Sequence, residues 1–419
     1  MTPLPQAPLT ATMLRAQPEH QRFLREDAAR QIDFFRPSLR EDGTFCVLDL
    51  NGAPLPDPVQ ELHTTTRLIH SFALAKRAGF TETDPMIGAG MACLWAHHRD
   101  PAFGGYVWSF DDGGIKDGLK LAYGHVFVLL AAASAKLAGH RDADRLLGDV
   151  RAVIDTHFWD EDAGLLRDEF TREWEVFSTY RGMNANMHGV EAFLTAFEAT
   201  GDTVYLDRAG RILDFFTGQI APDHNWRLPE HYTESWQVDT SYSGNPMFRP
   251  AGSTPGHSFE LGRLLLQHWD LTGRTQSTAP DTARQLIYRA LEDAWDVARG
   301  GFVYTLKTSG VVDIADRYWW PVTEAIGALA ALQNLDGGTQ DDEIWYQRIW
   351  AFATSHLIDT RHGGWFPELN AQNQPCGKQF VGKPDLYHAL QAVFLPQVNT
   401  LSRLAEALHA NAAKAESAI

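Results

Sequence analysis

A recurring helix that carries one strongly polar residue near its start, on an otherwise apolar surface, limits the folds open to this chain. It recurs about every 60 residues, six times in all. Such a side chain is costly to bury unless it is paired or faces a water-filled space. If the helices stand side by side in a ring, the six polar residues converge on one pocket, where we expect the chemistry. They are Arg67, His125, His188, His257, Glu324 and His388.

A second kind of helix lies between these, with apolar residues at i, i+3, i+4 and i+7. Segments 142–160, 203–220 and 282–298 show the pattern, which suits a helix with one face in solvent. Alternation of buried and half-exposed helices over six units predicts an all-α fold, an (α/α)6 barrel with an inner and an outer ring. An open helical solenoid is the alternative. The count of six and the polar residue in every inner helix favour closure.

Short segments rich in β-forming residues lie between the helices and repeat with the same period. Glycine permits the tight turn that begins most of them, and the aromatic residues that follow suit extended chain. We therefore expect short β-hairpin or extended segments in the connecting loops. Because ring-closed units share one core, we also expect residues 1–419 to form a single catalytic domain. The segments begin at Gly43, Gly104, Gly164, Gly300 and Gly363, with a weaker sixth at Asn225.

Composition excludes several classes of partner. The formal net charge of −17 argues against nucleic acid and anionic membranes, which require a cationic surface. Cys46, Cys93 and Cys376 match neither a zinc motif nor a disulfide framework. No secretory leader and no run of about 18 apolar residues is evident. We therefore expect a cytoplasmic protein with a small-molecule partner, and the sequence leaves open whether it forms a homo-oligomer.

The positive end of each inner-helix dipole is expected to point at the pocket, which disfavours imidazolium there. His257 and His388 are therefore candidate neutral bases. Glu260, on the same helical face as His257, can orient its imidazole or hold a substrate hydroxyl. The long Gly/Pro-rich loop over 241–257 is either a lid or disordered, and Arg249 in it is a candidate pocket residue. His125 is the member of the six that we expect to be structural.

Aromatic residues supply surfaces on which a sugar ring can stack, and Tyr123, Trp319 and Trp320 lie closest to the polar positions. Trp108 and Trp365 lie in the extended segments. Four histidines and a glutamate also satisfy a metal site by count, but ligands must meet at about 2.0–2.2 Å. Single residues on separate helices of a wide ring tend instead to surround a substrate-sized space. We expect neither a metal nor another cofactor.

Segments 181–192, 248–261, 317–325 and 383–392 resemble the N-acylglucosamine 2-epimerase superfamily, and the likeness covers nearly the whole chain. Segments 64–75 and 248–257 look most like its branch of aldose–ketose isomerases that act on mannose or sulfoquinovose. The resemblance implies an (α/α)6 barrel and metal-independent 1,2-proton transfer on a reducing sugar. It implies His257 and His388 as the catalytic pair. The pocket positions it implies are Arg67, Tyr123, Asn184, His188, Glu260, Trp319, Trp320 and Glu324.

The mechanism that follows from the resemblance begins with ring opening by His257, steadied by Glu260. His388 then removes the C2 proton as general base, and Arg67 and neutral His188 stabilise the cis-enediol. Return of the proton to C1 gives the ketose, and return to the opposite face of C2 gives the epimer.

The charges near the pocket bear on which sugar is bound. An anionic sugar needs cationic partners, whereas Asp385 would repel one and suits neutral hydroxyls. We therefore expect mannose, or a similar neutral aldose such as lyxose, rather than sulfoquinovose. The candidate cations are Arg67, Arg249, Arg317, Lys378 and Lys383.

Two other function classes remain open on the sequence. Glycoside hydrolases also use (α/α)6 barrels, but they need two carboxylates about 5–9.5 Å apart, for which Glu260 and Glu324 are the candidates. A sugar-binding protein without activity would use the same tryptophans, but would have no reason to hold two bases.

Overall fold

Six mostly buried helices form a closed ring in the computed structural model, which describes residues 13–335 and 338–417. The ring closes because the last inner helix packs against the first. This confirms the (α/α)6 barrel and excludes the open solenoid. The inner helices are α2 (Leu62–Arg77), α4 (Ala122–Leu137), α6 (Met183–Thr200), α9 (Pro255–Leu271), α11 (Trp319–Gln333) and α13 (Tyr387–Phe394).

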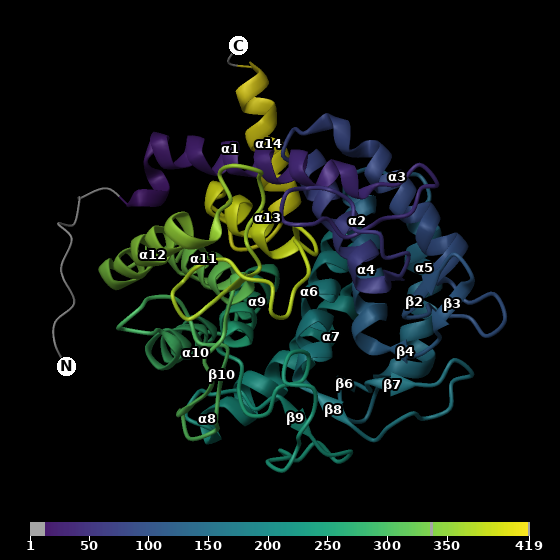
Figure 1. Cartoon of the computed structure of the whole chain (residues 1–419). Helices are drawn as coiled ribbons and strands as arrows, with labels where there is room; N and C mark the ends of the chain where they lie inside the picture. The colour runs from purple at the N-terminus through teal and green to yellow at the C-terminus, as the bar shows by residue number, and fades with distance from the viewer. Residues whose placement is uncertain (1–12, 336–337, 418–419) are drawn as a thin grey trace.

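Six outer helices surround this ring, and each packs mainly against one inner helix (Figure 1). The first helix of the chain packs against α13, so the N-terminal segment completes the last unit. Four outer helices continue into π-helical turns, at Leu94–His98, Ile154–Phe158, Asp214–Ile220 and Ala353–Leu357, which the sequence pattern does not predict. The outer helices are α1 (Pro18–Phe35), α3 (Asp84–Cys93), α5 (Ala143–Val153), α7 (Thr203–Leu213), α10 (Ala279–Ala294) and α12 (Gln340–Phe352).

Short antiparallel strands lie in the connecting segments, as expected. Four of them, β1, β4, β8 and β12, end directly before an inner helix and pair with a strand from the following unit, which fixes where that helix begins. The strands are β1 (Gln60–Glu61), β2 (Ser109–Asp111), β3 (Gly114–Asp117), β4 (Lys120–Leu121), β5 (Trp159–Asp160), β6 (Leu165–Leu166), β7 (Glu169–Phe170), β8 (Arg181–Gly182), β9 (His231–Tyr232), β10 (Thr305–Leu306), β11 (Val312–Ile314), β12 (Arg317–Tyr318) and β13 (Glu368–Leu369).

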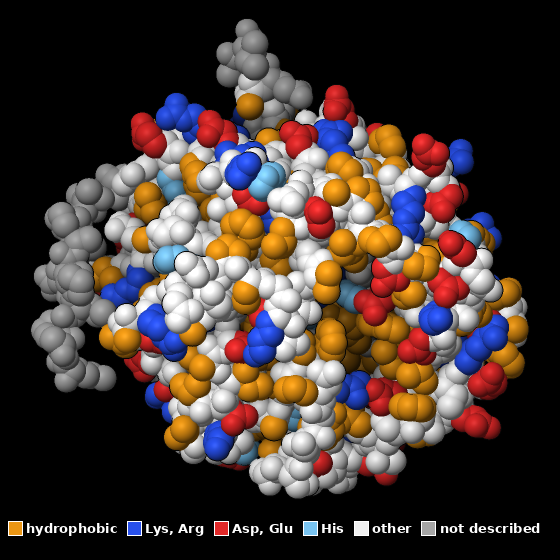
Figure 2. Space-filling model, viewed as in Figure 1, with side chains coloured by type: hydrophobic (Ala, Val, Ile, Leu, Met, Phe, Trp, Pro, Cys, Tyr) orange, Lys and Arg blue, Asp and Glu red, His pale blue; other side chains and the backbone are white. Residues whose placement is uncertain are grey.

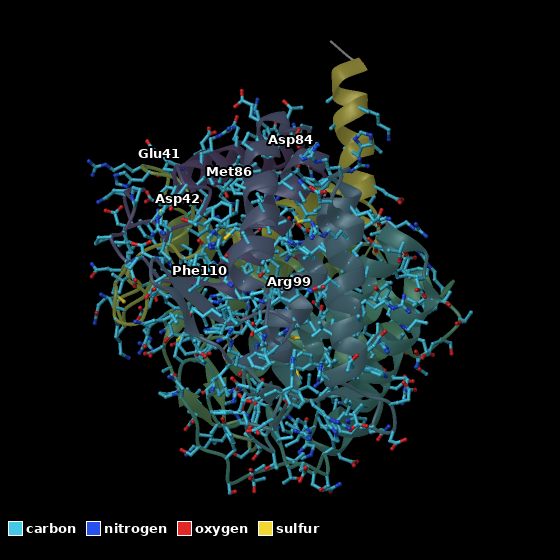
Figure 3. All side chains as sticks on the ribbon, turned by 90° about the vertical axis from the view of Figure 1, so that its right-hand side faces the viewer. Glu41, Asp42, Asp84, Met86, Arg99 and Phe110 are labelled. Atoms are coloured by element: carbon cyan, nitrogen blue, oxygen red, sulfur yellow. The ribbon has the colours of Figure 1, made fainter. Side chains whose placement is uncertain are left out.

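The C-terminal helix α14 (Leu404–Ser417) stands out from the body of the molecule (Figures 1 and 3). Its first turns are held to α2, where the Arg77 side chain donates to the carbonyl of Ala405 at 3.3 Å. The remaining short helices are η1 (Leu14–Ala16), η2 (Arg36–Ser38), η3 (Thr81–Thr83), α8 (Ala221–Asp223) and η8 (Leu395–Gln397). Within the described residues, none of the helices is both long and apolar enough to cross a bilayer. The expectation of no leader falls on a segment that lies partly outside the described residues.

A buried cation ties a loop to an inner helix in three of the units. In each, an aspartate and the carbonyl of a glycine four residues later both accept from the side chain of a lysine or arginine further along the chain. The sequence pattern does not predict these contacts. The three sets are Lys120 with Asp100 and Gly104, Arg317 with Asp296 and Gly300, and Lys383 with Asp359 and Gly363.

Candidate active site

A cavity of about 270 Å³ lies at the N-terminal ends of the inner helices. It is smaller than the roughly 300–1,000 Å³ sites that take drug-sized ligands, and so suits a smaller molecule. In Figure 2 the viewed face is hollowed close to the centre of the ring of helices, with hydrophobic side chains along much of the hollow. The sequence-predicted residues that line the cavity are Arg67, Tyr123, Asn184, His188, Arg249, His257, Glu260, Trp319, Trp320, Asp385 and His388. Glu324 lies directly behind His388.

The register of the inner helices explains which side chains reach the cavity. The second residue faces it in five of the six helices. The sixth residue, about one turn deeper, is polar in α2, α6, α9 and α11. The chain thus presents two polar layers along the axis. The upper layer consists of His63, Tyr123, Asn184, Trp320 and His388, and the lower layer includes Arg67, His188, Glu260 and Glu324.

His125 is the fourth residue of α4 and does not line the cavity. Its Nδ1–H donates to the carbonyl of Leu121 at 2.7 Å, and its Nε2 accepts from the backbone N–H of Tyr106 at 3.0 Å. Burial lowers its pKa to about 3, so the ring stays neutral. The expectation that all six polar residues converge is therefore wrong for His125, which is a core histidine.

His388 is held by Glu324 from the neighbouring inner helix. Its Nδ1 lies 2.7 Å from Oε1 of Glu324, and since a carboxylate only accepts, Nδ1 carries the hydrogen. The other ring nitrogen, Nε2, has no hydrogen-bond partner among the described residues, and His388 lines the cavity. Burial by itself would raise the pKa of Glu324, but the hydrogen bond from His388 and the charge of Arg263 lower it below its usual value.

His257 is held in the same way, but by Glu230 rather than Glu260. Its Nδ1 lies 2.9 Å from Oε1 and 3.0 Å from Oε2 of Glu230. The interpretation that Glu260 orients this imidazole is wrong, because the Glu260 side chain lies nearer to His188. Both oxygens of Glu260 are buried with no hydrogen-bond partner among the described residues, so they are available to a ligand.

Trp320 connects the two histidines. Its ring centroid lies 5.1 Å from that of His257 and 5.8 Å from that of His388, with interplanar angles of 32° and 35°. The ring also lies over the first turn of α9, where a Cβ on Gly256 would come within 2.2 Å of it. Trp319 meets His388 edge-on at 6.1 Å. Both tryptophans therefore line the cavity, whereas Trp365 donates to Asp27 in the core.

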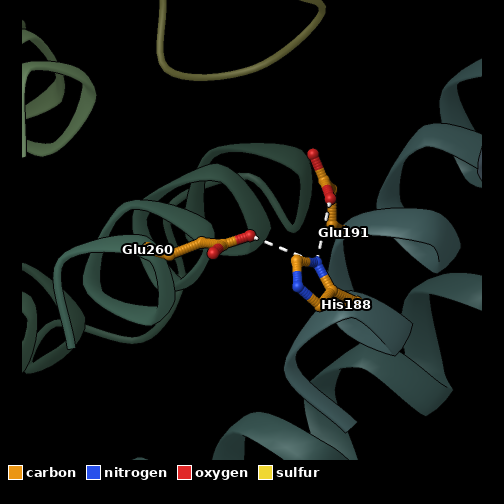
Figure 4. A group of neighbouring side chains, drawn as sticks. All are labelled: His188, Glu191 and Glu260. Carbon is orange, nitrogen blue, oxygen red and sulfur yellow. Dashed lines mark ion pairs between the residues drawn. The ribbon is translucent and has the colours of Figure 1, made fainter. Parts of the chain in front are cut away.

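At the floor of the cavity, His188 and Glu260 form a cluster with Glu191, which lies behind them and does not line the cavity (Figure 4). Nδ1 of His188 lies 3.5 Å from Glu191 and 3.4 Å from Glu260. Burial lowers the pKa of His188 to about 4 and, with the charge of Glu324, raises that of Glu260 well above its usual value. The Glu191 carboxylate already accepts hydrogen bonds from the side chains of Tyr387 and Gln391. The three side chains fit the composition of a metal site, yet the unpaired oxygens of Glu260 equally suit hydroxyl groups.

Arg67 is held by a hydrogen bond, an ion pair and two aromatic rings, although its Nε has no hydrogen-bond partner among the described residues. Its guanidinium donates to the Tyr123 hydroxyl at 2.8 Å, forms an ion pair with Asp385 at 3.2 Å, and lies over the rings of Phe127 and Tyr387. Asp385 also accepts from the backbone N–H of Tyr387 at 2.9 Å, at the start of α13. The charge of Asp385 is thus matched by that of Arg67.

The loop before α9 forms one wall of the cavity. Arg249 forms an ion pair with Glu169 and lies over the ring of Tyr180 at 4.3 Å, and the Tyr304 hydroxyl donates to the carbonyl of Met247 at 2.5 Å. These contacts tie the loop to neighbouring connecting segments of the barrel, so of the two sequence interpretations, disorder does not apply to residues 247–250.

Several lining residues lie outside the set predicted from the sequence. One of them, Asp168, is a carboxyl group whose pKa burial raises to about 8. His63 shares the second helical position with Tyr123 and Asn184, so a stricter alignment of the inner helices would have identified it. The others give no periodic signal, because they come from loops. The main additions are His63, Asp168, Tyr180, Glu230, Tyr304 and Phe380.

Comparison with known proteins gives one consistent family. The family model described as N-acylglucosamine 2-epimerase (GlcNAc 2-epimerase) matches residues 43–392. D-mannose isomerase of Thermobifida fusca is 39% identical over 405 residues, 95% of this chain and 99% of the relative. D-mannose isomerase of Pseudomonas cannabina pv. alisalensis is 38% identical over 400 residues, 93% of this chain and 96% of the relative. A crystal structure of D-mannose isomerase matches with a TM-score of 0.84 at 31% identity, covering 91% of this chain and 99% of that one.

Proposed function

Because the chain belongs to the N-acylglucosamine 2-epimerase family, we propose that it is an aldose–ketose isomerase that interconverts D-mannose and D-fructose. D-Lyxose is proposed as a second substrate. The proposal is supported by the full-length similarity to proteins named D-mannose isomerase. The observation that carries the chemistry is the pair of histidines at one cavity, each with Nδ1–H held by a buried glutamate and Nε2 left free.

We propose that His257 begins the reaction by moving a proton from the anomeric hydroxyl to the ring oxygen. The bond between C1 and the ring oxygen breaks, and the open-chain aldehyde forms. His388 Nε2 then takes the proton from C2, and the electron pair becomes the C1–C2 double bond of a cis-enediolate. Delivery of that proton to C1, with loss of the O2 proton and gain of one at O1, completes the ketose.

The negative charge that develops on oxygen needs donors that are already in place. Arg67 meets this need because Tyr123, Asp385 and two aromatic rings fix its guanidinium before substrate binds. Neutral His188 adds a donor at the floor. Asn184 Oδ1 and both Glu260 oxygens are buried without a partner among the described residues, and we assign them to the sugar hydroxyls.

The proposed preference for a neutral sugar rests on the ion pairs that the candidate cationic side chains already form. Each is already paired with a carboxylate, so a sulfonate or phosphate would have to displace an existing ion pair. Binding an anionic sugar is therefore unfavourable. The pairs are Arg67 with Asp385, Arg249 with Glu169, Arg317 with Asp296, Lys378 with Asp316, and Lys383 with Asp359.

The test is incubation of the protein with mannose and lyxose, in turn, in heavy water, with detection of ketose and of deuterium at C1 and C2. Isomerisation predicts ketose with deuterium at C1, whereas epimerisation predicts the C2 epimer with deuterium at C2. Turnover of a sulfonated sugar with no reaction of any neutral aldose would overturn the substrate assignment. A protein that only binds sugar would exchange no hydrogen at all.

Replacement of His388 separates isomerisation from glycoside hydrolysis. His388→Asn is expected to lower kcat/KM by about 10²–10⁴-fold, the usual contribution of a general base. Retained activity would favour a mechanism based on Glu260 and Glu324. We further propose that residues 1–419 act as one catalytic domain in the cytoplasm.

A further inference from the structure

Glu230 is a buried carboxylate that no sequence pattern singles out, yet it makes the closest polar contacts of His257. Both of its oxygens lie within 3.0 Å of Nδ1, and the side chain is 5% exposed. Oε1 also accepts from the backbone N–H of Thr254 at 3.1 Å, at the start of α9. The carboxylate therefore ties the histidine ring to the helix that carries it.

The backbone of Glu230 is fixed as firmly as its side chain. Its N–H donates to the carbonyl of Gly252 at 3.0 Å, and its carbonyl accepts from the N–H of Met183 at 3.0 Å. It thus joins the loop before α9 to the first residue of α6. A carboxylate held from both sides cannot follow the imidazole if it rotates, so it sets the orientation of the ring.

The two histidine–glutamate pairs differ in what else each glutamate contacts. Glu324 is also paired with Arg263 at 3.4 Å, so its charge is shared between a cation and His388. The only ion pair of Glu230 within the described residues is the one with His257. The charge of Glu230 is therefore not shared with a second cation.

We propose that Glu230 is the positioning residue of His257: it fixes the Nδ1–H tautomer, turns Nε2 to the cavity, and balances the imidazolium formed during ring opening. This inference rests on the proposed function, in which His257 moves the proton that opens the sugar ring. A residue with this part in the reaction must act through His257. Replacement of Glu230 should therefore have little further effect on activity in a protein that already lacks His257.

Glu230→Gln keeps the shape of the side chain and removes its charge. We expect kcat to fall by about 10²–10³-fold, within the usual contribution of acid–base catalysis, with KM changed less than about threefold. The matched control is Glu343→Gln, which alters a buried carboxylate bound to Gln333 and Gln347 away from the cavity. It is expected to leave both constants unchanged. Wild-type kinetics in Glu230→Gln would overturn the proposal.

A double-mutant comparison separates positioning from a general structural effect. In a His257→Gln background, Glu230→Gln is expected to cost less than about twofold in kcat/KM, because residues that act as one unit are not additive. An equal loss in both backgrounds would show that Glu230 acts independently of His257 and would overturn the proposal.

A measurement that needs no turnover keeps this inference distinct from the proposed function. With ¹⁵N-labelled histidine, the wild-type protein is expected to show a strongly hydrogen-bonded Nδ1–H resonance that is absent in His257→Gln and shifted or lost in Glu230→Gln. If the wild type converts no sugar but shows this signature, the function fails and the positioning stands. An Nε2–H tautomer at His257 would overturn the positioning, whatever the activity.

Discussion

The contact between Gly256 and Trp320 couples one backbone position to both histidines. A Cβ at Gly256 would lie 2.2 Å from Cζ3 of Trp320, and a rigid indole cannot yield as a flexible side chain would. Gly256→Ala is therefore expected to displace the ring that contacts His257 and His388. We expect kcat/KM to fall at least about tenfold, and the free energy of unfolding to fall by about 1–3 kcal/mol, as measured by sugar turnover and urea denaturation.

Gly148→Ala is the control for this substitution. Gly148 lies within α5, and a Cβ there would meet nothing within 4 Å. The free energy of unfolding should rise by about 0.5–1 kcal/mol, because alanine loses less conformational entropy in a helix. Unchanged kinetics in Gly256→Ala would show that Trp320 does not position the histidines.

The cluster of His188, Glu191 and Glu260 yields a second prediction at the scale of residues. Because Glu191 is occupied by Tyr387 and Gln391 and Glu260 is assigned to hydroxyls, dialysis against EDTA should leave kcat/KM unchanged within about twofold. Loss of activity on dialysis, with recovery on adding Mn²⁺ or Zn²⁺, would instead make this cluster a metal centre. Elemental analysis of the dialysed protein provides the control.

Sequence reasoning identified the two histidines but matched neither of them with the carboxylate that holds it, for a physical reason. His257 and His388 are visible because each is a polar residue near the start of an apolar helix. Glu260 lies on the same helical face as His257, so it looked like the natural partner. The real partner, Glu230, lies 27 residues earlier in the chain, and only the folded loop brings it close.

At the scale of elements, the three buried cations that bind connecting loops are contacts that a single substitution can test. Lys383 is 1% exposed and donates to Asp359 at 2.7 Å and to the carbonyl of Gly363 at 2.6 Å. Lys383→Met leaves a buried carboxylate without this partner, which typically costs about 3–5 kcal/mol. Urea denaturation should show a loss of this size in the free energy of unfolding.

Lys378→Met is the matched control, because Lys378 pairs with Asp316 on the surface, where ion pairs contribute about 0–1 kcal/mol. Asp359→Asn added to Lys383→Met should restore part of the loss, since the unpaired charge is then removed. If Lys383→Met lowers the free energy of unfolding no more than Lys378→Met does, the buried ion pair does not hold the loop.

The inner helices could be predicted because an apolar surface continues along each of them for several turns. A wrong estimate of where a helix begins or ends does not remove that pattern. The direction of a single side chain is more sensitive. A helix turns about 100° per residue, and an alignment error of two residues moves a side chain to the opposite face. His125 shows the effect, since it lies two residues from Tyr123, which lines the cavity. The π-helical turns could not be predicted either, because they add residues to the outer helices without changing the apolar pattern.

At the scale of the whole molecule, the closed ring places many ionisable groups out of water, including six histidines. Burial lowers the pKa of all six, to about 4 for His20, His70 and His188 and to about 3 for His63, His98 and His125. In the unfolded chain each binds a proton near pH 6.5. Five carboxyl groups act in the opposite sense, because burial raises the pKa of Asp168 to about 8, of Glu198 to about 7, of Glu260 well above its usual value, and of Glu61 and Asp214 above theirs.

These shifts predict loss of stability in mild acid. Between about pH 6 and 4.5 the unfolded chain binds protons at these six histidines that the folded chain does not bind. The six outnumber the five carboxyl groups, and burial also lowers the pKa of His157, His231 and His268. Where the unfolded state binds more protons, stability falls as pH falls. The free energy of unfolding, measured by urea denaturation at pH 7, 6 and 5, should therefore drop with increasing steepness. His125→Gln removes one of the six, so its slope should be shallower than that of the wild type by up to about 1.4 kcal/mol per pH unit. A slope equal to that of the wild type would mean that His125 also takes up its proton in the folded barrel.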